Sequence, residues 1–349
     1  MEAGLTEISK PLLATLRGEQ RTVPPIWLMR QAGRYLPEYR ELRATKGGFL
    51  ELVNDSDAAA EVTVQPLRRF GFDGAILFSD ILVIPQALGQ KLWFVTGEGP
   101  RLAPLMENRA MIDALDAYDP QILAPVFETV RKVAAMLPVT TTFLGFAGSP
   151  WTIATYMVAG QGSREQADAR LLAYQDREGF QALIDRIEAA TIDYLSRQIE
   201  AGVEAVQLFD SWAGSLSPAE FERWVIAPNA RIIAALRARH PGVPLIGFPK
   251  GAGAKLAAYA RETGADAIGL DETVDPVWAN AVLPDGLPVQ GNLDPLALVA
   301  GGERLSEAVA GILGAFPERP HIFNLGHGIR QETPISHVEA LVAQVRGEQ

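Results

Sequence analysis

The sequence predicts an α/β fold, a single-domain (β/α)8 barrel of the TIM type, and three observations predict it. Eight short apolar runs are bounded by Gly, Pro or Asp, and buried parallel strands read as continuous apolar runs of this kind. Amphipathic helical patterns separate most of these runs, as parallel crossovers require. No Ser- or Pro-rich linker, low-complexity tract or further repeat interrupts the alternation, so we expect one domain over residues 1–349.

Eight predicted strands form the barrel wall. In chain order they cover residues 26–29, 74–78, 140–146, 205–209, 244–248, 267–270, 288–290 and 322–325. The clearest helical patterns cover residues 181–199, 218–239, 254–262, 303–315 and 335–345. From the fourth strand onward, successive strands start about 20 to 40 residues apart, as plain βα units do. An open doubly wound sheet is the alternative, but no glycine-rich phosphate turn follows the first strand.

The first two gaps between strands are longer than one crossover helix needs. Residues 35–72 and 82–138 must therefore hold extra helices, and residues 90–102 resemble a hairpin. We expect long insertions after the first two strands, at the end of the barrel where functional loops lie.

The composition of the 349 residues excludes several classes of protein. Apolar residues make up 48% and charged residues 21%, which is typical of a globular protein and excludes intrinsic disorder. Lys and Arg total 31 against 42 Asp and Glu, so a net charge of −11 disfavours binding to nucleic acid or to anionic membranes. Residues 1–21 lack a signal-peptide pattern and no apolar run is long enough to span a bilayer, so we expect a cytoplasmic protein.

Metal and thiol chemistry are disfavoured because the chain has no cysteine. The histidines are His240, His321, His327 and His337, and they show no metal-binding spacing. We therefore expect no metal. His321 begins the last predicted strand, at the opposite end of the barrel from the functional loops, and is expected to be structural. His240 and His337 are expected on helix surfaces.

Arg30 and Arg34 follow the first predicted strand, four residues apart. If the chain turns helically there, both guanidinium groups share a face and can point into the barrel mouth. A guanidinium binds a carboxylate through two parallel hydrogen bonds, so this pair suits a ligand with several carboxylates or phosphates. Pairing with structural acids at the rim is the alternative.

Asp80 follows a strongly apolar strand and precedes another apolar run. A carboxylate placed there is poorly solvated and needs partners. It could cap the next helix or pair with Arg30, or it could accept N–H donors from a ligand and stabilise a developing cation. Its position at a strand end favours the functional role.

Three further residues lie at predicted strand ends or close behind them. His327 stands between two glycines, which deny it packing neighbours and favour contact with a ligand. Tyr156 lies two turns into a helix that starts at the barrel mouth, so its hydroxyl either packs or reaches the ligand. Ser211 either caps a short helix or lines the mouth.

Lys250, after the fifth predicted strand, carries a competing hypothesis. A desolvated lysine at a barrel strand end can form a Schiff base. The open setting between Pro249 and Gly251 favours a solvated or anion-steering lysine instead.

Four segments resemble the uroporphyrinogen decarboxylase family. They are residues 25–34 (PIWLMRQAGR), 78–82 (FSDIL), 145–156 (GFAGSPWTIATY) and 323–328 (FNLGHG). The first and third resemble the two signatures of the family, in the right order and spacing, and the likeness extends from about Pro11 to the C-terminus. One departure is the run AGQGSR at 159–164, where the family more often has a Glu-Gly-Gly-Gly-Ser-Lys type of sequence.

The resemblance implies a homodimeric barrel that converts uroporphyrinogen III to coproporphyrinogen III by removing CO2 from four acetate side chains, in haem and chlorophyll biosynthesis. It implies no cofactor. Carried over position by position, it implies substrate contacts from Arg30, Gln31, Ala32, Gly33, Arg34, Asp80, Tyr156, Ser211 and His327. The expected catalytic residues are Asp80 and Arg30.

Elementary chemistry agrees with this expectation. Loss of CO2 needs an electron sink, and a pyrrole protonated on a ring carbon provides one without a cofactor. Asp80 could stabilise the resulting cation near the pyrrole N–H. The proton donor stays open between Arg30, which is a very weak acid, His327, Tyr156 and a bound water.

Three rival functions remain at this point. A corrinoid methyltransferase-like barrel would hold zinc through Cys and His, and this chain has no Cys. A Schiff-base lyase would use Lys250. A tetrapyrrole-binding protein without activity would bind the ligand and release no CO2.

Overall fold

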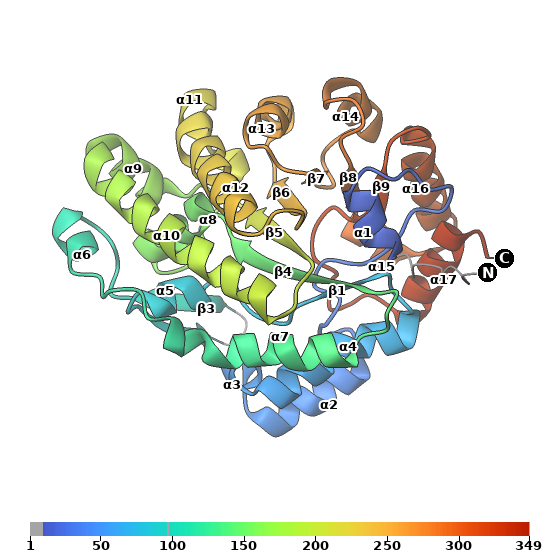
Figure 1. Ribbon diagram of the computed structural model, residues 1–349, viewed down its shortest axis with the longest axis horizontal. Helices are drawn as coiled ribbons and strands as arrows, with labels where there is room; N and C mark the ends of the chain where they lie inside the picture. Colours follow the sequence, from blue (N-terminus) through green and yellow to red (C-terminus); the bar gives the residue numbers. More distant parts are fainter. Residues whose placement is uncertain (1–9, 96–97, 349) are drawn as a thin grey trace, which may run out of the picture.

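A parallel sheet of seven strands forms the centre of the computed structural model, which describes residues 10–95 and 98–348 (Figure 1). The strands in spatial order are β1 (Gly74–Ile76), β4 (Thr142–Gly148), β5 (Ala205–Asp210), β6 (Leu245–Pro249), β7 (Ala267–Gly269), β8 (Val289–Leu293) and β9 (His321–Leu325). Each strand pairs in parallel with the next one in this order, and the sheet curls with helices outside it. All carboxyl ends therefore meet at one rim.

The strand predicted over 26–29 is wrong as a strand, because this segment forms only an isolated bridge between Ile26 and Phe323 of β9. On its other side, the backbone N–H of Asp73 donates to the Ile26 carbonyl oxygen at 2.9 Å. Pro25 has no N–H, and the Ile26 N–H is taken by the Asp73 side chain at 2.8 Å, so no ladder can form. The extended segment nevertheless lies between β9 and β1.

Several predicted strand ends also shift. Predicted strands ending at 146, 209 and 290 continue to Gly148, Asp210 and Leu293. Gly148, Asp210 and Asn292 therefore belong to strands and not to the loops that follow them.

Seventeen α-helices occur in the described part of the chain. The first ten are α1 (Pro11–Leu16), α2 (Pro37–Lys46), α3 (Phe49–Asn54), α4 (Ser56–Phe70), α5 (Val83–Ala87), α6 (Arg109–Asp113), α7 (Ala124–Met136), α8 (Pro150–Ala159), α9 (Ala167–Gln175) and α10 (Arg177–Ala201). The rest are α11 (Pro218–Phe221), α12 (Ala227–Arg239), α13 (Leu256–Glu262), α14 (Pro276–Val282), α15 (Pro295–Ala300), α16 (Gly302–Ala315) and α17 (Ile335–Arg346). Each helical pattern of the sequence falls on one of these, with a π-helical turn, η3 (Glu222–Ile226), joining α11 to α12.

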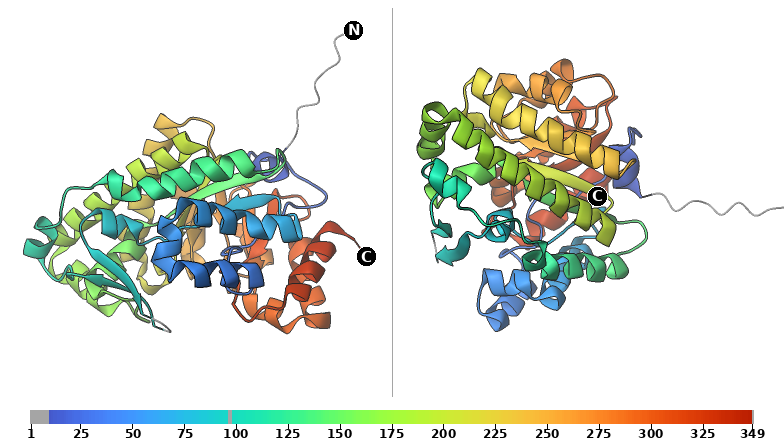
Figure 2. Two further views of the ribbon diagram at one scale, coloured as in Figure 1. Left: turned by 90° about the horizontal axis from the view of Figure 1, so that it is seen from below. Right: turned by 60° about the vertical axis from the view of Figure 1, so that its left-hand side comes forward.

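The chain before β1 and between β1 and β4 is rich in extra elements. Helices α2, α3 and α4 precede β1 and pack on one another below the sheet in Figure 1. Between β1 and β4 lie α5, α6, the 3-10 turn η1 (Pro120–Leu123) and α7. The predicted hairpin also lies there, with β2 (Lys91–Val95) antiparallel to β3 (Gly99–Ala103), and its turn at 96–97 falls outside the described residues. The hairpin projects from the body in Figure 2.

Inside the curl of the sheet, three fully buried side chains connect distant strands. The Trp27 indole N–H donates to Gln290 Oε1 at 2.9 Å, and Gln290 Nε2 donates to Gln207 Oε1 at 3.1 Å. Gln207 lies on β5 and Gln290 on β8, so this relay crosses the interior and ties the 26–29 segment to both. Buried polar groups need such partners, and the relay provides them for the Trp27 indole N–H, for Gln290 and for Gln207 Oε1. Within residues 10–95 and 98–348, no helix is both long and apolar enough to cross a membrane.

Candidate active site at the carboxyl ends of the strands

Arg30 is held at the rim by hydrogen bonds to the residue before it. The Met29 N–H donates to Asn324 Oδ1 at 2.9 Å, and the Met29 carbonyl accepts from the Ile329 N–H at 2.9 Å. Arg30 itself adopts a left-handed backbone with φ 63°, which is uncommon for a residue with a side chain. The helical turn considered for 30–34 is therefore wrong. Arg30 is exposed, yet desolvation by the surrounding protein lowers the pKa of its guanidinium. The nearby Asp80 and Tyr156 oppose this lowering.

The neighbours of Arg30 differ in what they offer a ligand. Gln31 is fully buried, where its Oε1 accepts from the Leu28 N–H at 3.1 Å and its Nε2 donates to the Gly74 carbonyl at 3.0 Å. Ala32 is buried and Gly33 half-buried, whereas Arg34 is exposed. Arg34 lies near enough to Arg30 to lower its pKa, so the two cations share one side of the rim.

Asp80 follows β1 and uses only one of its carboxylate oxygens within the protein. Its Oδ1 accepts from the Leu82 N–H at 2.8 Å, just before α5. In the described part of the chain, Oδ2 has no hydrogen-bond partner and Asp80 makes no ion pair. Burial raises the pKa of Asp80, while the Leu82 N–H and the positive charge of Arg30 oppose that rise. The carboxylate is therefore partly desolvated, and its Oδ2 is unpartnered within the described chain.

Tyr156 on α8 faces the same place. Its ring lies 6.4 Å from that of Trp212, centroid to centroid, and the residue is half-buried. Burial raises the pKa of Tyr156, with smaller effects from Trp212, Asp80 and Arg30. The phenol is therefore a neutral donor within electrostatic reach of both charged groups.

His327 follows β9 between two glycines that leave no room for side chains. A Cβ at Gly326 would lie 2.1 Å from the Glu272 nitrogen, and one at Gly328 would lie 3.0 Å from Arg30 Nε. Burial lowers the pKa of His327 to about 3, helped by Lys250 and Arg30 and opposed by Asp271. The imidazole is therefore neutral at physiological pH, so that one ring nitrogen can donate a hydrogen bond and the other can accept one.

Ser211 lies on the other side of the mouth, after β5. The short helix that follows, η2 (Ala213–Ser215), has Trp212 and not Ser211 at its cap position, so the capping role considered for Ser211 is wrong. Ser211 instead lines a pocket of about 390 Å³ with Lys250.

The remaining histidines take structural places. His321 begins β9, is buried, and bonds through Nε2 to the Gly291 carbonyl at 2.8 Å; burial lowers its pKa to about 4. His240 ends α12 half-buried, and His337 on α17 bonds the Leu298 carbonyl at 3.0 Å. Over residues 10–95 and 98–348, no three His, Asp or Glu side chains gather in a way that could hold a metal ion.

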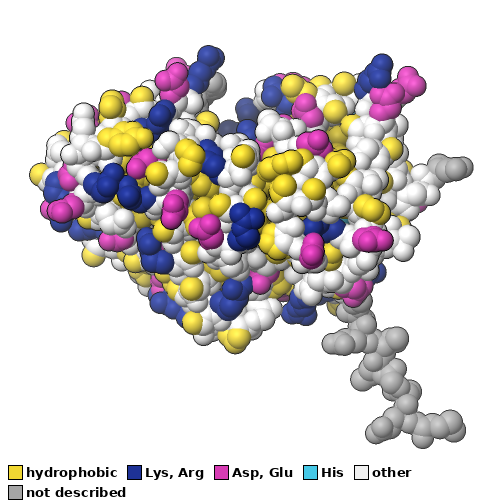
Figure 3. Space-filling model, turned by 90° about the horizontal axis from the view of Figure 1, so that it is seen from above, with side chains coloured by type: hydrophobic (Ala, Val, Ile, Leu, Met, Phe, Trp, Pro, Cys, Tyr) yellow, Lys and Arg dark blue, Asp and Glu magenta, His cyan; other side chains and the backbone are white. Residues whose placement is uncertain are grey.

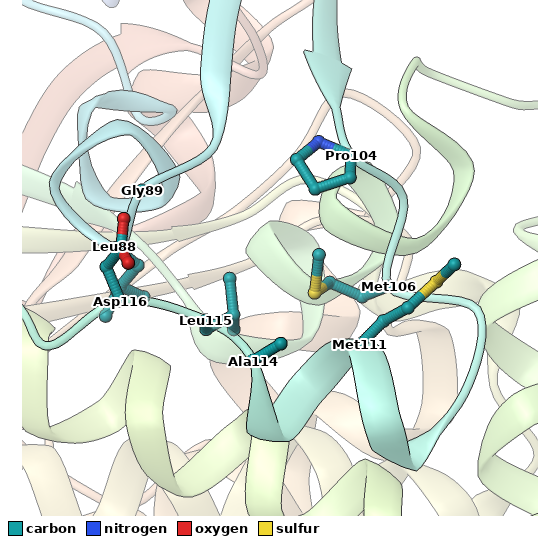
Figure 4. Close-up of a pocket in the computed structure, with 8 residues that line it drawn as sticks. All are labelled: Leu88, Gly89, Pro104, Met106, Met111, Ala114, Leu115 and Asp116. Carbon is teal, nitrogen blue, oxygen red and sulfur yellow. The ribbon is translucent and has the colours of Figure 1, made fainter.

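A second pocket, of about 120 Å³, lies away from the rim between the hairpin and α6 (Figure 4). Its lining is Leu88, Gly89, Pro104, Met106, Met111, Ala114, Leu115 and Asp116. Asp116 is the one charged residue of this lining, and the other side chains in it are apolar. It therefore suits no anionic ligand.

Two residues that shape the site carry no role in the sequence predictions. Asn324 sits in the quoted FNLGHG run, yet only the fold shows that its Oδ1 holds the Met29 N–H. Asp210 ends β5 and is fully buried. Both residues are polar and lie in otherwise apolar strands, and this is the sequence feature by which they could have been found.

Comparison with known proteins decides the family. A family model described as Uroporphyrinogen decarboxylase (URO-D) matches residues 8–347. The chain belongs to the uroporphyrinogen decarboxylase family. It is 71% identical to a uroporphyrinogen decarboxylase of Rhizorhabdus wittichii, over 99% of this chain and 100% of that protein. It is 70% identical to one of Sphingopyxis alaskensis, over 97% of this chain and 98% of that protein.

Membership of the uroporphyrinogen decarboxylase family makes this protein a carboxy-lyase of porphyrin biosynthesis. A solved methyltransferase from Methanosarcina mazei has a similar fold, with a TM-score of 0.82 at 18% identity, covering 98% of this chain and 99% of that one. At that identity the likeness concerns the fold alone. It supports the TIM-barrel type of architecture and says nothing of methyl transfer.

Proposed function

We propose that this protein removes CO2 from the four acetate side chains of uroporphyrinogen III, giving coproporphyrinogen III, at the rim that carries Arg30 and Asp80. The observation that carries the proposal is the open Oδ2 of a partly desolvated Asp80 within electrostatic reach of Arg30 and Tyr156. No cofactor takes part, because the substrate ring accepts the electrons itself.

The reaction balances with protons alone. Protonation of a pyrrole carbon creates an iminium-like cation, and the bond between the acetate methylene and its carboxylate then breaks. CO2 leaves, the electron pair flows into the ring, and the resulting methylene carbon takes up a proton to become a methyl group while the ring loses one. Asp80 stabilises the cation, since a fixed anion in a poorly solvated place acts strongly on charge that develops in the transition state.

The other side chains of the rim hold the substrate. Arg30 and Arg34 bind its carboxylates from one side, and the Gln31 to Gly33 segment lies between them. Tyr156, Ser211 and His327 complete the contacts with neutral hydrogen-bonding groups. The proton donor is one of Arg30, Tyr156, His327 and a bound water.

We also propose that residues 1–349 form one domain. The 26–29 segment completes the barrel wall as its eighth member. The stretches of chain before β1 and before β4 are insertions near the mouth. The protein works as a homodimer in the cytoplasm.

The test is incubation of the purified protein with uroporphyrinogen III in the dark under reducing conditions, with chromatography following the carboxyl groups. We expect intermediates that lose one carboxyl group at a time and a final tetracarboxylate. Tight binding without any loss of carboxyl groups would instead make the protein a tetrapyrrole binder. Borohydride trapping of substrate on Lys250 would favour the Schiff-base mechanism.

A further inference from the structure

We propose that the pocket at the ends of β5, β6 and β7 is a second carboxylate subsite, in which Lys250 and Arg164 bind an acidic side chain of the tetrapyrrole that is not reacting. This inference rests on the proposed function and extends it to a part of the mouth opposite Arg30 and Arg34. The chemistry requires such a place. Every ring of uroporphyrinogen carries an acetate and a propionate, which is more negative charge than Arg30 and Arg34 can balance.

The pocket is built from four separate stretches of chain. Its lining residues are Arg164, Ser211, Trp212, Gly214, Ser215, Lys250, Gly251, Asp271 and Thr273, and it holds about 390 Å³. Its volume exceeds that of the pocket beside the hairpin, which is lined by apolar groups and a single acid. On the face shown in Figure 3, basic and acidic side chains are intermingled. The pocket lining, by contrast, has two cations and one acid, in a chain of net charge −11.

Lys250 is rigidly mounted in the pocket. Its N–H donates to the Asp210 carbonyl at 3.0 Å, and its own carbonyl accepts from the Gly214 N–H at 3.0 Å. Gly214 and Gly251 pack so closely that a Cβ at Gly214 would lie 2.6 Å from the Gly251 carbonyl oxygen. The backbone under the lysine is thus fixed before a ligand arrives, which lowers the entropy cost of binding.

The ammonium group of Lys250 is not fully used within the protein. Its Nζ lies 3.6 Å from Glu272 Oε1, beyond the ~2.7 to 2.9 Å of a charge-assisted hydrogen bond. No other ion pair or hydrogen bond of Nζ occurs among the described residues. Arg164 is exposed and makes no side-chain hydrogen bond or ion pair within the described chain. Both cations have donors free for a ligand.

The one acid of the pocket lining is already occupied. Asp271 Oδ2 accepts from the Gly251 N–H at 2.7 Å, and its Oδ1 accepts from the Thr273 N–H at 2.9 Å and from the Thr273 hydroxyl. Both carboxylate oxygens of Asp271 are therefore already occupied by donors of the protein itself. Among the described residues, the side-chain donors left for a ligand are the two cations, the Ser211 hydroxyl and the Trp212 indole N–H.

The pocket is continuous with the catalytic rim. The positive charge of Lys250 helps to lower the pKa of His327, so the two side chains lie within electrostatic reach of each other. Trp212 lines the pocket and also packs beside Tyr156. A tetrapyrrole centred on Asp80 can therefore reach it with a side chain of one ring.

The test compares Lys250→Met, Lys250→Arg and Arg164→Met with the wild type and with Arg304→Met. Arg304 on α16 has a side chain 80% exposed and serves as the control for loss of one positive charge. Binding of the product coproporphyrinogen III, kept reduced and dark, is measured by titration calorimetry, and KM and kcat are measured with uroporphyrinogen III. The binding measurement needs no turnover, so it tests the subsite even if the wild type proves inactive.

We expect Lys250→Met to raise KM about tenfold and to lower kcat less, because uniform binding is lost. Lys250→Arg should restore most of the affinity, and Arg164→Met should cost about threefold. A fall in product affinity would assign the subsite to a propionate, and an effect on the substrate alone would assign it to an acetate. Changes no larger than those of Arg304→Met, in both measurements, would overturn the proposal.

Discussion

Asp80 and Asp210 occupy similar places in the fold but have different surroundings. Each lies at the carboxyl end of a strand, Asp80 after β1 and Asp210 at the end of β5. Asp80 is partly exposed, has one oxygen without a partner in the described structure, and lies within electrostatic reach of Arg30. Asp210 is fully buried, where its Oδ1 accepts from the Thr152 hydroxyl at 2.6 Å and its Oδ2 has no partner in the described structure. Burial raises the pKa of both, for Asp210 to about 7.

The comparison shows that a raised pKa alone does not identify a catalytic acid. Among the described residues Asp210 makes no ion pair, and no cation contributes to its pKa shift. The Thr152 hydroxyl that donates to Asp210 also accepts from the backbone N–H of Trp212 at 3.2 Å. It ties the start of the β5 loop to α8. Asp80 has Arg30 within electrostatic reach and one oxygen without a partner in the described chain. Its negative charge is therefore available to interact with a bound substrate.

The largest expected effect is that of Asp80→Asn. The variant should keep its fold and lose turnover by at least on the order of 100-fold, because an anion that stabilises developing positive charge is gone. Steady-state rates with uroporphyrinogen III measure the loss, and Asp210→Asn is the matched control, with a change in kcat below about threefold. Equal losses in the two variants would erase the distinction between the two aspartates.

Arg34→Ala tests whether the side of the mouth that carries Arg30 and Arg34 binds the carboxylates of the substrate. We expect KM for uroporphyrinogen III to rise about tenfold at low salt, since one charge-assisted contact is lost. The ratio of variant to wild-type KM should shrink as salt increases, because salt screens an exposed cation. Arg304→Ala provides the comparison, and an unchanged KM would assign Arg34 to structure.

Gly328→Ala tests how closely Arg30 is held. A Cβ there would lie 3.0 Å from Arg30 Nε and 3.1 Å from its Cζ, so the guanidinium must move. We expect kcat/KM to fall roughly three- to tenfold, because small displacements of a group that acts in the reaction, as proposed for Arg30, lower the rate. Gly314→Ala on α16, where a Cβ meets nothing within 4 Å, should leave activity unchanged. An active Gly328→Ala would show that the position of Arg30 is not critical.

Asp210→Asn carries the smallest effect, on stability rather than rate. The folded-state pKa of Asp210, about 7, lies above its usual value of 3.8, so the folded protein binds an extra proton between these pH values. The contribution of Asp210 to the free energy of unfolding of the wild type is therefore fully present below pH 3.8. It is lost as pH rises toward 7. The asparagine does not titrate. The melting temperature of the variant minus that of the wild type should rise by about 2 °C or more between pH 5 and pH 8.

A difference that stays constant with pH would show that Asp210 does not titrate in this range. Calorimetric scans at both values decide it, and other groups cancel because both proteins contain them.

The sequence by itself determined the order of the elements, since apolar runs and helical patterns report burial on each segment separately. It also singled out Arg30, Asp80 and His327, because polar residues directly after apolar strands are costly unless they are used. Tertiary structure alone decided what each group meets. Periodicity could not show that Pro25 and Asp73 stop the 26–29 segment from pairing as a strand. Nor could it show that Asn324, almost 300 residues along the chain, fixes the backbone before Arg30, since hydrogen bonds between distant segments depend on three-dimensional register. Asp80 and Asp210 look equivalent in sequence and differ only in which neighbours the fold brings to them.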